Sequence, residues 1–321
     1  MYYFIINPAS RSGKGLTVWK QTKRELRRQG IVYRAFVTRY PRHSIRLTKE
    51  LCAKVKGAFT LVILGGDGTA NEVLSAVPKE DLERITFAYL PSGSSNDLAR
   101  GLGLPQDPVK ILGEILSGQH ILEMDYGTIS LPGSERHPYR FAVSAGIGFD
   151  ATVCKEALDS PIKQALNLVG LGKLSYLVIA VKQILTCHTA DLTVSVDGGA
   201  PVTYPRVFFA AAMNQRFEGG GLPVAPHADP TDHVLSLCIL HGFPKFKAFV
   251  ILPALMLGGK HIHLKGITLI DCRRADIHTS EPLCVHSDGE YRGFHDRLTF
   301  SCSDHTIQVV AGSSASHSKR T

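Results

Sequence analysis

The chain has 321 residues, 44% hydrophobic and 20% charged, with a formal net charge of +8. These values are typical of a soluble globular protein with room for two domains. The longest apolar run, residues 249–257, contains Pro253 and is far shorter than the roughly 20 residues of a membrane-spanning helix, so any membrane contact is expected to be peripheral. The positive charge suits nucleic acid, an anionic membrane surface or an anionic cofactor equally well.

The seven cysteines are scattered and form no close pair of the redox or zinc type. The N-terminal segment lacks a basic leader and a small-residue cleavage site, and it is expected to be a first strand. These features favour a reduced, cytoplasmic protein without an export signal.

The first third of the chain alternates strand-like and helical patterns. Strands are predicted at residues 2–6, 32–38, 59–64 and 85–90. One predicted helix follows the first strand and ends near residue 29, and two more cover residues 42–55 and 69–77. This βαβαβ order predicts a parallel sheet with right-handed crossovers and ligands at the carboxyl ends of its strands. Asn7, Thr38 and Gly65 fall at such ends.

A basic loop at residues 9–15 contains Gly13 and Lys14, which invite comparison with a Walker-A loop. That motif needs Gly at position 8 and Ser or Thr at position 15, whereas the chain has Pro8 and Gly15. We therefore reject a Walker-A loop. Contact of Arg11 and Lys14 with phosphate and a solvated basic turn stay equally open.

The motif Gly-Gly-Asp-Gly-Thr at residues 65–69 joins a buried strand to a helix. Glycines between a strand and a helix N-terminus allow backbone N–H groups to approach a phosphate. Asp67 adds a carboxylate that would repel a polyphosphate unless a divalent cation or a substrate proton lay between them. The motif thus indicates phosphoryl transfer rather than nucleotide binding alone.

A second loop of small residues, 91–100, follows the strand at residues 85–90. Ser95, Asn96 or Asp97 is expected to cap the helix that begins there, which would be the preferred interpretation of this loop in isolation. Since the strands are neighbours, the two glycine turns are expected to face one another across one cleft.

From about residue 123 strand-like runs dominate. They cover residues 125–130, 139–144, 191–197, 202–213, 235–240, 267–277, 283–287 and 298–303, with helices at 149–158, 174–185 and 245–257. This pattern predicts an antiparallel β-sandwich after a boundary near Met124, with the ligand site in the cleft between the two halves.

Three features of this half are interpreted as structural rather than functional. The Gly-x-Gly at residues 146–148 is a weak match to a dinucleotide fingerprint and is expected to be a close-packed turn. His261 and His263 are expected on one face of a strand, as surface histidines, because no further zinc ligands can be named. The apolar stripe within residues 246–257 has helical spacing, which indicates core more often than lipid contact, and its lipid-facing interpretation depends on the rest of the sequence. It comprises Phe246, Phe249, Val250, Leu252, Leu255, Met256 and Leu257.

The segment Val285–Glu290 ends in two carboxylates, Asp288 and Glu290, separated by Gly289. Asp-Gly is a strong hairpin-turn signal. A carboxylate within reach of an alcohol can also act as general base in phosphoryl transfer. The spacing supports both interpretations equally.

Together, Asn7-Pro8, the motifs at residues 65–72 and 91–100, the segment 144–150 and Asp288-Gly289-Glu290 resemble the diacylglycerol kinase catalytic family, and most closely its bacterial soluble lipid kinases. The resemblance covers nearly the whole chain. It implies an α/β doubly wound nucleotide-binding domain at residues 1–124 and a β-sandwich lipid-substrate domain at 125–303. It further implies that residues 304–312 return to the first domain, with ATP and Mg²⁺ in the cleft.

By this resemblance, Asp288, helped by Glu290, would deprotonate the lipid hydroxyl, and Asp67 and Asp97 would organise metal and phosphates, Asp97 within the catalytic set. The implied nucleotide-binding residues are Asn7, Thr38, Gly65, Gly66, Asp67, Gly68, Thr69, Ser94 and Asn96. Ser94 stands where the family usually has Thr, and the hydroxyl is retained.

A structural Mg²⁺ is implied at residues 229–234, with Asp232 as side-chain ligand and main-chain oxygens of Asp229 and Val234. The family usually has Gly at position 233 and Asp at 236, where this chain has His233 and Ser236. Glycine there serves a turn conformation that His tolerates less well, which puts this metal in doubt.

The resulting hypothesis is an ATP-dependent lipid kinase, with diacylglycerol as the first candidate acceptor and phosphatidic acid as its product. It would act in the cytoplasm with transient contact at the inner, anionic face of the membrane and without nucleic acid, and it leaves a homodimer open. NAD kinase, which shares the first turn, is the rival enzyme. A catalytically silent lipid-binding or regulatory protein is the rival from another class.

Overall fold

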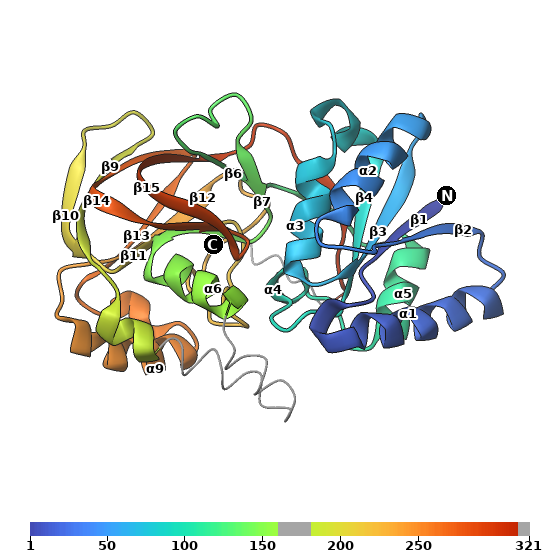
Figure 1. Ribbon diagram of the computed structural model, residues 1–321, viewed down its shortest axis with the longest axis horizontal. Coiled ribbons are helices and arrows are strands. Elements are labelled where there is room, and N and C mark those ends of the chain that lie inside the picture. Colours follow the sequence, from blue (N-terminus) through green and yellow to red (C-terminus); the bar gives the residue numbers. More distant parts are fainter. Residues whose placement is uncertain (160–180, 314–321) are drawn as a thin grey trace. The chain divides into compact units, whose positions relative to one another are not determined.

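A computed structural model describes residues 1–159 and 181–313, which form two compact units (Figure 1). Unit 1 comprises Met1–Asp125 together with the described residues from His305 onward, and unit 2 comprises Tyr126–Asp304. Within the described part of the chain, no helix combines the length and apolarity needed to cross a membrane.

Unit 1 is built on a six-stranded sheet of order β2-β1-β3-β4-β16-β5, in which only the β16–β5 pairing is antiparallel. Its strands are β1 (Tyr2–Ile6), β2 (Tyr33–Val37), β3 (Phe59–Gly65), β4 (Ile85–Pro91), β5 (Ile121–Met124) and β16 (Ile307–Val310). Its helices are α1 (Ser10–Arg28), α2 (His43–Lys54), α3 (Asp67–Ala76), the 3-10 helix η1 (Lys79–Arg84), α4 (Asp97–Gly101) and α5 (Pro108–Ser117).

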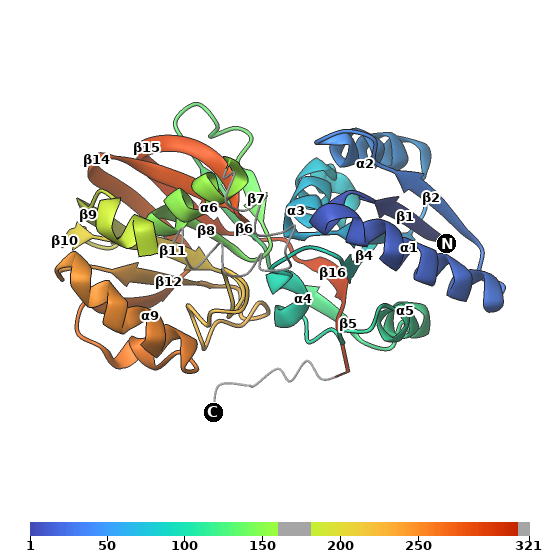
Figure 2. The ribbon, with the colours of Figure 1, turned by 60° about the horizontal axis from the view of Figure 1, so that its bottom comes forward.

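The central strands β3 and β4 are buried on both faces, which explains why both are predominantly apolar. On one face Trp19 of α1 and Ile115 of α5 pack in a core with Phe4, Val62 and Ala88. Helices α2 and α3 lie on the other side (Figure 2). The predicted order of alternating strands and helices is confirmed.

Two helix starts in unit 1 depart from simple patterns. Helix α3 begins at Asp67, two residues before the predicted Thr69, since Gly66 is its extended N-cap residue. In α1, Arg11, Ser12 and Gly13 have positive φ, so regular helix begins only after Gly13.

Unit 2 is an antiparallel β-sandwich whose ten-stranded sheet runs β13-β12-β11-β8-β14-β15-β6-β7, with β9 paired to β14 and β10. The strands are β6 (Gly127–Ser130), β7 (Tyr139–Phe141), β8 (Ser144–Gly148), β9 (Ala190–Val196), β10 (Val202–Val207), β11 (Phe209–Met213), β12 (Leu235–Leu240), β13 (Ile267–Cys272), β14 (Arg274–Ser287) and β15 (Glu290–Cys302). The helices are α6 (Phe149–Asp159), the 3-10 helix η2 (Lys245–Lys247), α9 (Ala248–Met256) and the 3-10 helix η3 (Lys260–His263).

Alternating residues of β11 divide unit 2 into two cores, as expected for a strand covered on both faces. Ala210 and Ala212 belong to the core inside the sandwich. Ala211 and Met213 face a second core, which also contains Ile251 and Leu255 of α9. The predicted architecture of an α/β domain followed by a β-sandwich is confirmed.

Several local predictions for unit 2 are wrong. The Gly-x-Gly at residues 146–148 is not a turn, because both glycines lie in strand β8. His261 and His263 lie in the 3-10 helix η3 rather than a strand, and His261 is fully buried with Nε2 3.0 Å from the Val224 carbonyl oxygen. Residues 202–213 form two strands, β10 and β11.

The apolar stripe of residues 246–257 is only partly core. Leu255 is buried, whereas Phe246, Val250, Met256 and Leu257 are exposed. The side chain of Leu252 is not among those described. Of the helix predicted at residues 174–185, residues 174–180 lie outside the described chain, and residues 181–185 are helical.

Candidate active site

The carboxyl ends of β1, β3 and β4 are tied together by side chains from the loops that follow them. Asn7 Nδ2 donates to Thr69 Oγ1 at 3.0 Å, which links the end of β1 to the first turn of α3. The hydroxyls of Ser10 and Ser92 share a hydrogen bond of 2.6 Å. Asn7 therefore contacts the Gly-Gly-Asp-Gly-Thr turn within unit 1.

The two glycine turns touch through their backbones. A Cβ on Gly93 would lie 2.6 Å from Cα of Gly66, and a Cβ on Gly65 would lie 2.6 Å from Cβ of Thr69. The Ser92 N–H donates to the Gly65 carbonyl oxygen at 2.7 Å. Gly66 has an extended backbone that any residue can adopt, so backbone conformation is not the reason for glycine in these turns. Glycine is required because the turns are packed so closely that an added Cβ would collide with neighbouring atoms.

Asp67 joins the two turns. Its carboxylate accepts hydrogen bonds from the N–H groups of Asp97 at 3.2 Å and Leu98 at 3.4 Å, and from the Tyr89 hydroxyl at 3.3 Å. A carboxylate at a helix N-terminus satisfies unpaired N–H groups and interacts favourably with the helix dipole. Asp67 therefore caps α4 from the neighbouring turn. Burial, followed by the Asp67 charge, raises the pKa of Tyr89, which stays a neutral donor.

The expected self-capping of α4 is wrong. Asn96 is the N-cap residue but adopts a left-handed conformation with φ of 55°, and it makes no side-chain hydrogen bond to the helix. Its side chain instead accepts from the Gly93 N–H at 2.9 Å and donates to the Gly93 carbonyl oxygen at 3.1 Å. Asn96 thereby shapes the second turn.

The other predicted residues of unit 1 lie around these turns. Asp97 is 5% exposed and accepts from Arg100 Nη1 at 2.5 Å. Thr38 follows β2 and its N–H donates to the Ile6 carbonyl oxygen at 2.8 Å, while Ser94 is exposed in the second turn. Gly68 lies in the first turn of α3.

In unit 2, Asp288 and Gly289 form the two-residue turn of the β14–β15 hairpin. Their φ values of 47° and 79° are both left-handed, as a type I′ turn requires, and Ser287 pairs with Glu290 across it. The hairpin interpretation of the Asp-Gly pair is therefore correct.

The Asp288 carboxylate is held by three backbone N–H groups of the β7–β8 connection. Oδ2 accepts from Ala142 at 2.8 Å, and Oδ1 accepts from Val143 at 2.8 Å and Ser144 at 3.1 Å. The Asp288 N–H returns a bond of 2.8 Å to the Ser144 carbonyl oxygen. Such contacts fix the orientation of the carboxylate and stabilise its charge. Glu290 begins β15 on the far side of the turn and is half-buried.

A buried imidazole supports this turn, a feature that sequence reasoning missed. His286 Nδ1 accepts the Gly289 N–H at 3.2 Å, and Nε2 lies 3.0 Å from Asp150 Oδ2 and 3.2 Å from Glu218 Oε1. Gly146 makes room for this contact, because a Cβ there would lie 1.9 Å from Asp150 Oδ2 and 2.7 Å from His286 Nε2. The sequence signal for this contact is the Gly-x-Gly of β8, which by itself is only a weak match to a dinucleotide fingerprint. Its first glycine, Gly146, leaves the space that Asp150 and His286 occupy.

His286, Asp150 and Glu218 also have ligand atoms within 4.8 Å of one another, close enough to suggest a metal site. Burial raises the pKa of Asp150. Metal-bound histidine donates from its second ring nitrogen, whereas Nδ1 here accepts an N–H and so holds the proton on Nε2. The trio is therefore a hydrogen-bonded cluster.

The loop proposed for a structural metal is a hydrogen-bonded turn. Asp229 Oδ1 accepts from the Thr231 N–H at 3.1 Å, and Asp232 Oδ1 accepts from the Val234 N–H at 3.2 Å. His233 has a φ of 62°, so this position does require the glycine-like conformation. Ser236, which stands where the family usually has Asp, donates to Asp271 Oδ1 at 2.7 Å. The Asp271 carboxylate therefore lies next to the position that the family's Asp would occupy.

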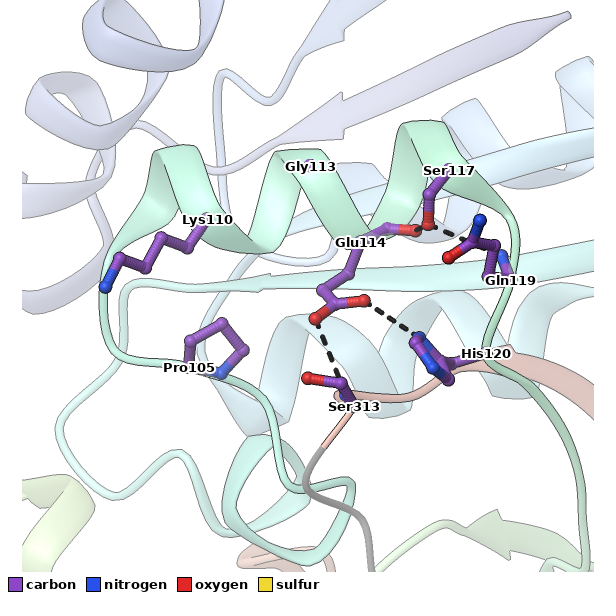
Figure 3. Close-up of a pocket in the computed structure, with 8 residues that line it drawn as sticks. All are labelled: Pro105, Lys110, Gly113, Glu114, Ser117, Gln119, His120 and Ser313. Carbon is purple, nitrogen blue, oxygen red and sulfur yellow. Dashed lines mark hydrogen bonds and ion pairs between the residues drawn. The ribbon is translucent and has the colours of Figure 1, made fainter.

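A pocket of about 490 Å³ opens on another part of unit 1, along α5 (Figure 3). The Glu114 carboxylate in this pocket contacts His120 Nδ1 at 3.0 Å and the Ser313 N–H at 3.5 Å. None of the predicted site residues lines it. The chemistry of the glycine turns identifies the candidate site better than the size of this pocket.

The residues at the turns fit the chemistry of ATP and Mg²⁺. Thr69 and Ser94 offer hydroxyls, the first turn of α3 offers backbone N–H groups to phosphate, and Asp67 and Asp97 offer the hard oxygen ligands that Mg²⁺ prefers. In this structure both carboxylates are engaged by protein donors, Asp67 by α4 and Asp97 by Arg100.

Solved structures share this fold. The chain superposes on a diacylglycerol kinase from Bacillus anthracis with a TM-score of 0.69 and 17% identity, covering 98% of each chain. An NAD kinase from Archaeoglobus fulgidus in complex with ATP superposes with a TM-score of 0.52 and 13% identity, over 98% of this chain and 95% of the other. The architecture is thus one that lipid and nucleotide kinases have in common.

The sequence is similar to two family models in succession. Residues 1–129 match the diacylglycerol kinase catalytic domain, and residues 142–311 match the YegS C-terminal NAD kinase beta sandwich-like domain. The chain is 29% identical to a Bacillus subtilis protein described as lipid kinase YtlR, over 91% of this chain and 94% of that protein. It is 25% identical to the Bacillus subtilis diacylglycerol kinase, over 73% of this chain and 72% of the relative. The chain belongs to the diacylglycerol kinase family, with a YegS-type second domain.

Proposed function

We propose that this protein is an ATP-dependent lipid kinase that transfers the γ-phosphoryl group to the hydroxyl of a lipid alcohol, with diacylglycerol as the first candidate. Family membership makes it a phosphotransferase. ATP, Mg²⁺ and the lipid acceptor are the parts that we propose.

The observation that carries this proposal is the orientation of Asp288. An alcohol needs a base positioned to receive its proton as phosphoryl transfer proceeds. The three N–H groups of residues 142–144 hold the Asp288 carboxylate in one orientation on a tight hairpin turn. Glu290, the first residue after this turn, carries a second carboxylate. A rigid carboxylate on a sheet element is suited to this role.

The reaction then balances without a further reactant. The lipid hydroxyl oxygen forms a bond to the γ-phosphorus while the bond from that phosphorus to the β–γ bridging oxygen breaks. The hydroxyl proton passes to the Asp288 carboxylate, with Glu290 assisting, and ADP leaves. Phosphatidic acid is the product when the alcohol is diacylglycerol.

Unit 1 is proposed to bind the nucleotide through the two glycine turns. Asp67 and Asp97 would hold Mg²⁺, which when bound neutralises phosphate charge. The residues proposed to contact the nucleotide are Asn7, Thr38, Gly65, Gly66, Asp67, Gly68, Thr69, Ser94 and Asn96. The acceptor is proposed to be taken from the inner face of an anionic membrane by a cytoplasmic protein.

The test is to incubate the protein with γ-labelled ATP, Mg²⁺ and either dispersed diacylglycerol or NAD, and to identify the labelled product. Label in phosphatidic acid is expected. Label in NADP would instead identify an NAD kinase. Absence of label with diacylglycerol, other lipid alcohols and NAD would favour a catalytically silent lipid-binding protein.

A further inference from the structure

Helix α9 and the residues around it present an apolar surface that the fold of unit 2 does not use. Its most exposed large side chains are Phe246 at 71%, Leu257 at 67%, and Val250 and Met256 at 61% each. We call these four residues the α9 face. Helix α9 itself contains no charged residue.

The opposite side of the same helix accounts for its packing. Ala248, Ile251 and Leu255 are at most 8% exposed and join the second core of unit 2. The helix is therefore anchored without the α9 face. Monomeric proteins rarely leave several large apolar side chains together in water, and such patches mark interaction sites.

The stretch of chain that contains the α9 face carries charge of one sign. The chain contains no Asp or Glu between Asp232 and Asp271, and within that stretch it carries Lys245, Lys247, Lys260 and Lys265. Lys260 and Lys265 are exposed, and Lys247 Nζ donates to the Lys265 carbonyl oxygen at 3.0 Å, which places these flanks together. Exposed apolar side chains bordered by lysines supply the two contributions to binding at a membrane interface, which are buried apolar area and attraction to anionic lipid.

A further exposed apolar side chain, that of Leu185, lies near this surface. Lys245 Nζ lies 3.5 Å from the carbonyl oxygen of Leu185, whose side chain is 60% exposed. Lys245 therefore links the border of the α9 face to the helical residues 181–186.

We propose that the α9 face docks the protein onto an anionic lipid bilayer, with Phe246, Val250, Met256 and Leu257 in the headgroup–acyl boundary and the lysines on lipid phosphates. This inference deepens the proposed function, since a kinase of a membrane lipid must reach its acceptor there. A second copy of the chain is a poorer occupant, because a symmetric contact would set the same lysines against each other. An anionic bilayer can cover the apolar side chains with its acyl region and attract the lysines with its phosphates.

The test compares vesicles of pure phosphatidylcholine with vesicles of phosphatidylcholine mixed with phosphatidylglycerol, using flotation of the full chain. Binding to the anionic vesicles is expected, and it should weaken with salt. Val250→Asp with Leu257→Asp should abolish it, and Lys260→Glu with Lys265→Glu should weaken it roughly tenfold or more. Val202→Asp, at a similarly exposed valine of β10, is the matched control and should bind like the wild type.

Activity separates docking from catalysis. The Val250→Asp, Leu257→Asp variant should lose most activity on long-chain diacylglycerol in anionic vesicles but keep wild-type activity on a short-chain, water-soluble diacylglycerol. If the wild type phosphorylates neither lipid, the proposed function fails while the flotation result still decides the docking. Equal vesicle binding by wild type and variant would overturn the docking proposal, as would a wild-type dimer that the same changes convert to a monomer.

Discussion

Asp288 shows how one residue can satisfy two interpretations that sequence spacing presents as alternatives. It occupies a left-handed turn position, and the same turn presents its carboxylate to three N–H groups of the β7–β8 connection. Asp tolerates this conformation better than most residues do. The hairpin is therefore the means by which the carboxylate is oriented.

Asp288→Asn should lower kcat by about two to four orders of magnitude, the usual contribution of a general base, and leave ATP binding measurable. The amide keeps one acceptor but turns an NH₂ group toward backbone donors, so thermal unfolding must be recorded alongside turnover. Asp304→Asn, at an exposed carboxylate, is the control for the chemical change and should be neutral. Wild-type turnover of a folded Asp288→Asn protein would remove Asp288 from the base role.

Gly146→Ala tests the cluster beneath that hairpin. The new methyl group would overlap Asp150 Oδ2 and crowd His286 Nε2, so we expect a destabilisation of about 1–3 kcal/mol in chemical denaturation, together with reduced turnover. Gly113→Ala is the matched control, since nothing lies within 4 Å of a Cβ there and helix α5 should gain about 0.5–1 kcal/mol. Equal effects of the two substitutions would show that the Asp150–His286 contact tolerates displacement.

At the scale of elements, the main finding is that α4 is capped from outside. The helix has no side-chain cap of its own, and Asp67, thirty residues earlier, supplies the acceptor. A cap from another turn couples the positions of the two turns. Local sequence patterns do not reveal it, because capping rules consider only neighbouring residues.

Asp67→Ala should destabilise the protein by about 0.5–2 kcal/mol through loss of this cap, and Asp67→Asn should cost less because one acceptor remains. If Asp67 also organises metal and phosphates, both variants should lose turnover to a similar degree. Asp107→Ala removes the N-cap of α5, whose carboxylate accepts from Val109 at 2.8 Å and Lys110 at 3.0 Å, and it should reduce stability with little loss of turnover. Full activity of a folded Asp67→Asn protein would leave Asp67 with a structural role alone.

At the scale of the whole molecule, the chain leaves unit 1 at Asp125 and returns to it at His305. Strand β16 then lies between β4 and β5, in parallel with the first and antiparallel to the second. Strand β16, the last strand that the structure describes, is therefore an interior strand of the first unit.

A chain ending at Asp304 should lose the native fold of unit 1, because β5 would lose its pairing with β16 and β4 would become an edge. Trp19 is the single tryptophan and lies in the core of unit 1, so its fluorescence reports on this unit selectively. We expect red-shifted emission and loss of its cooperative thermal transition. A chain ending at Ser313 keeps β16 and should behave like the full chain, and native Trp19 emission from the shorter protein would contradict this prediction.

The sequence by itself determined the alternation of strands and helices over residues 2–90, the two architectures and the residue types at the turns. The periodicity of apolar residues and the positions of glycines are local properties of the sequence, and they predict strands and turns directly, as at residues 59–69. The motifs at residues 65–72, 91–100 and 288–290 likewise sufficed to indicate the kinase family, which the comparisons confirm.

Only the tertiary structure decided which groups these side chains meet. Asp67 caps α4, His286 supports the Gly289 N–H, and Asp288 is held by residues 142–144. It also decided that His261 is buried and that Phe246 and Val250 are exposed, against what their local patterns predicted. Burial and hydrogen-bond partners depend on segments far apart in the chain, and pattern rules contain no information about which distant segments pack together.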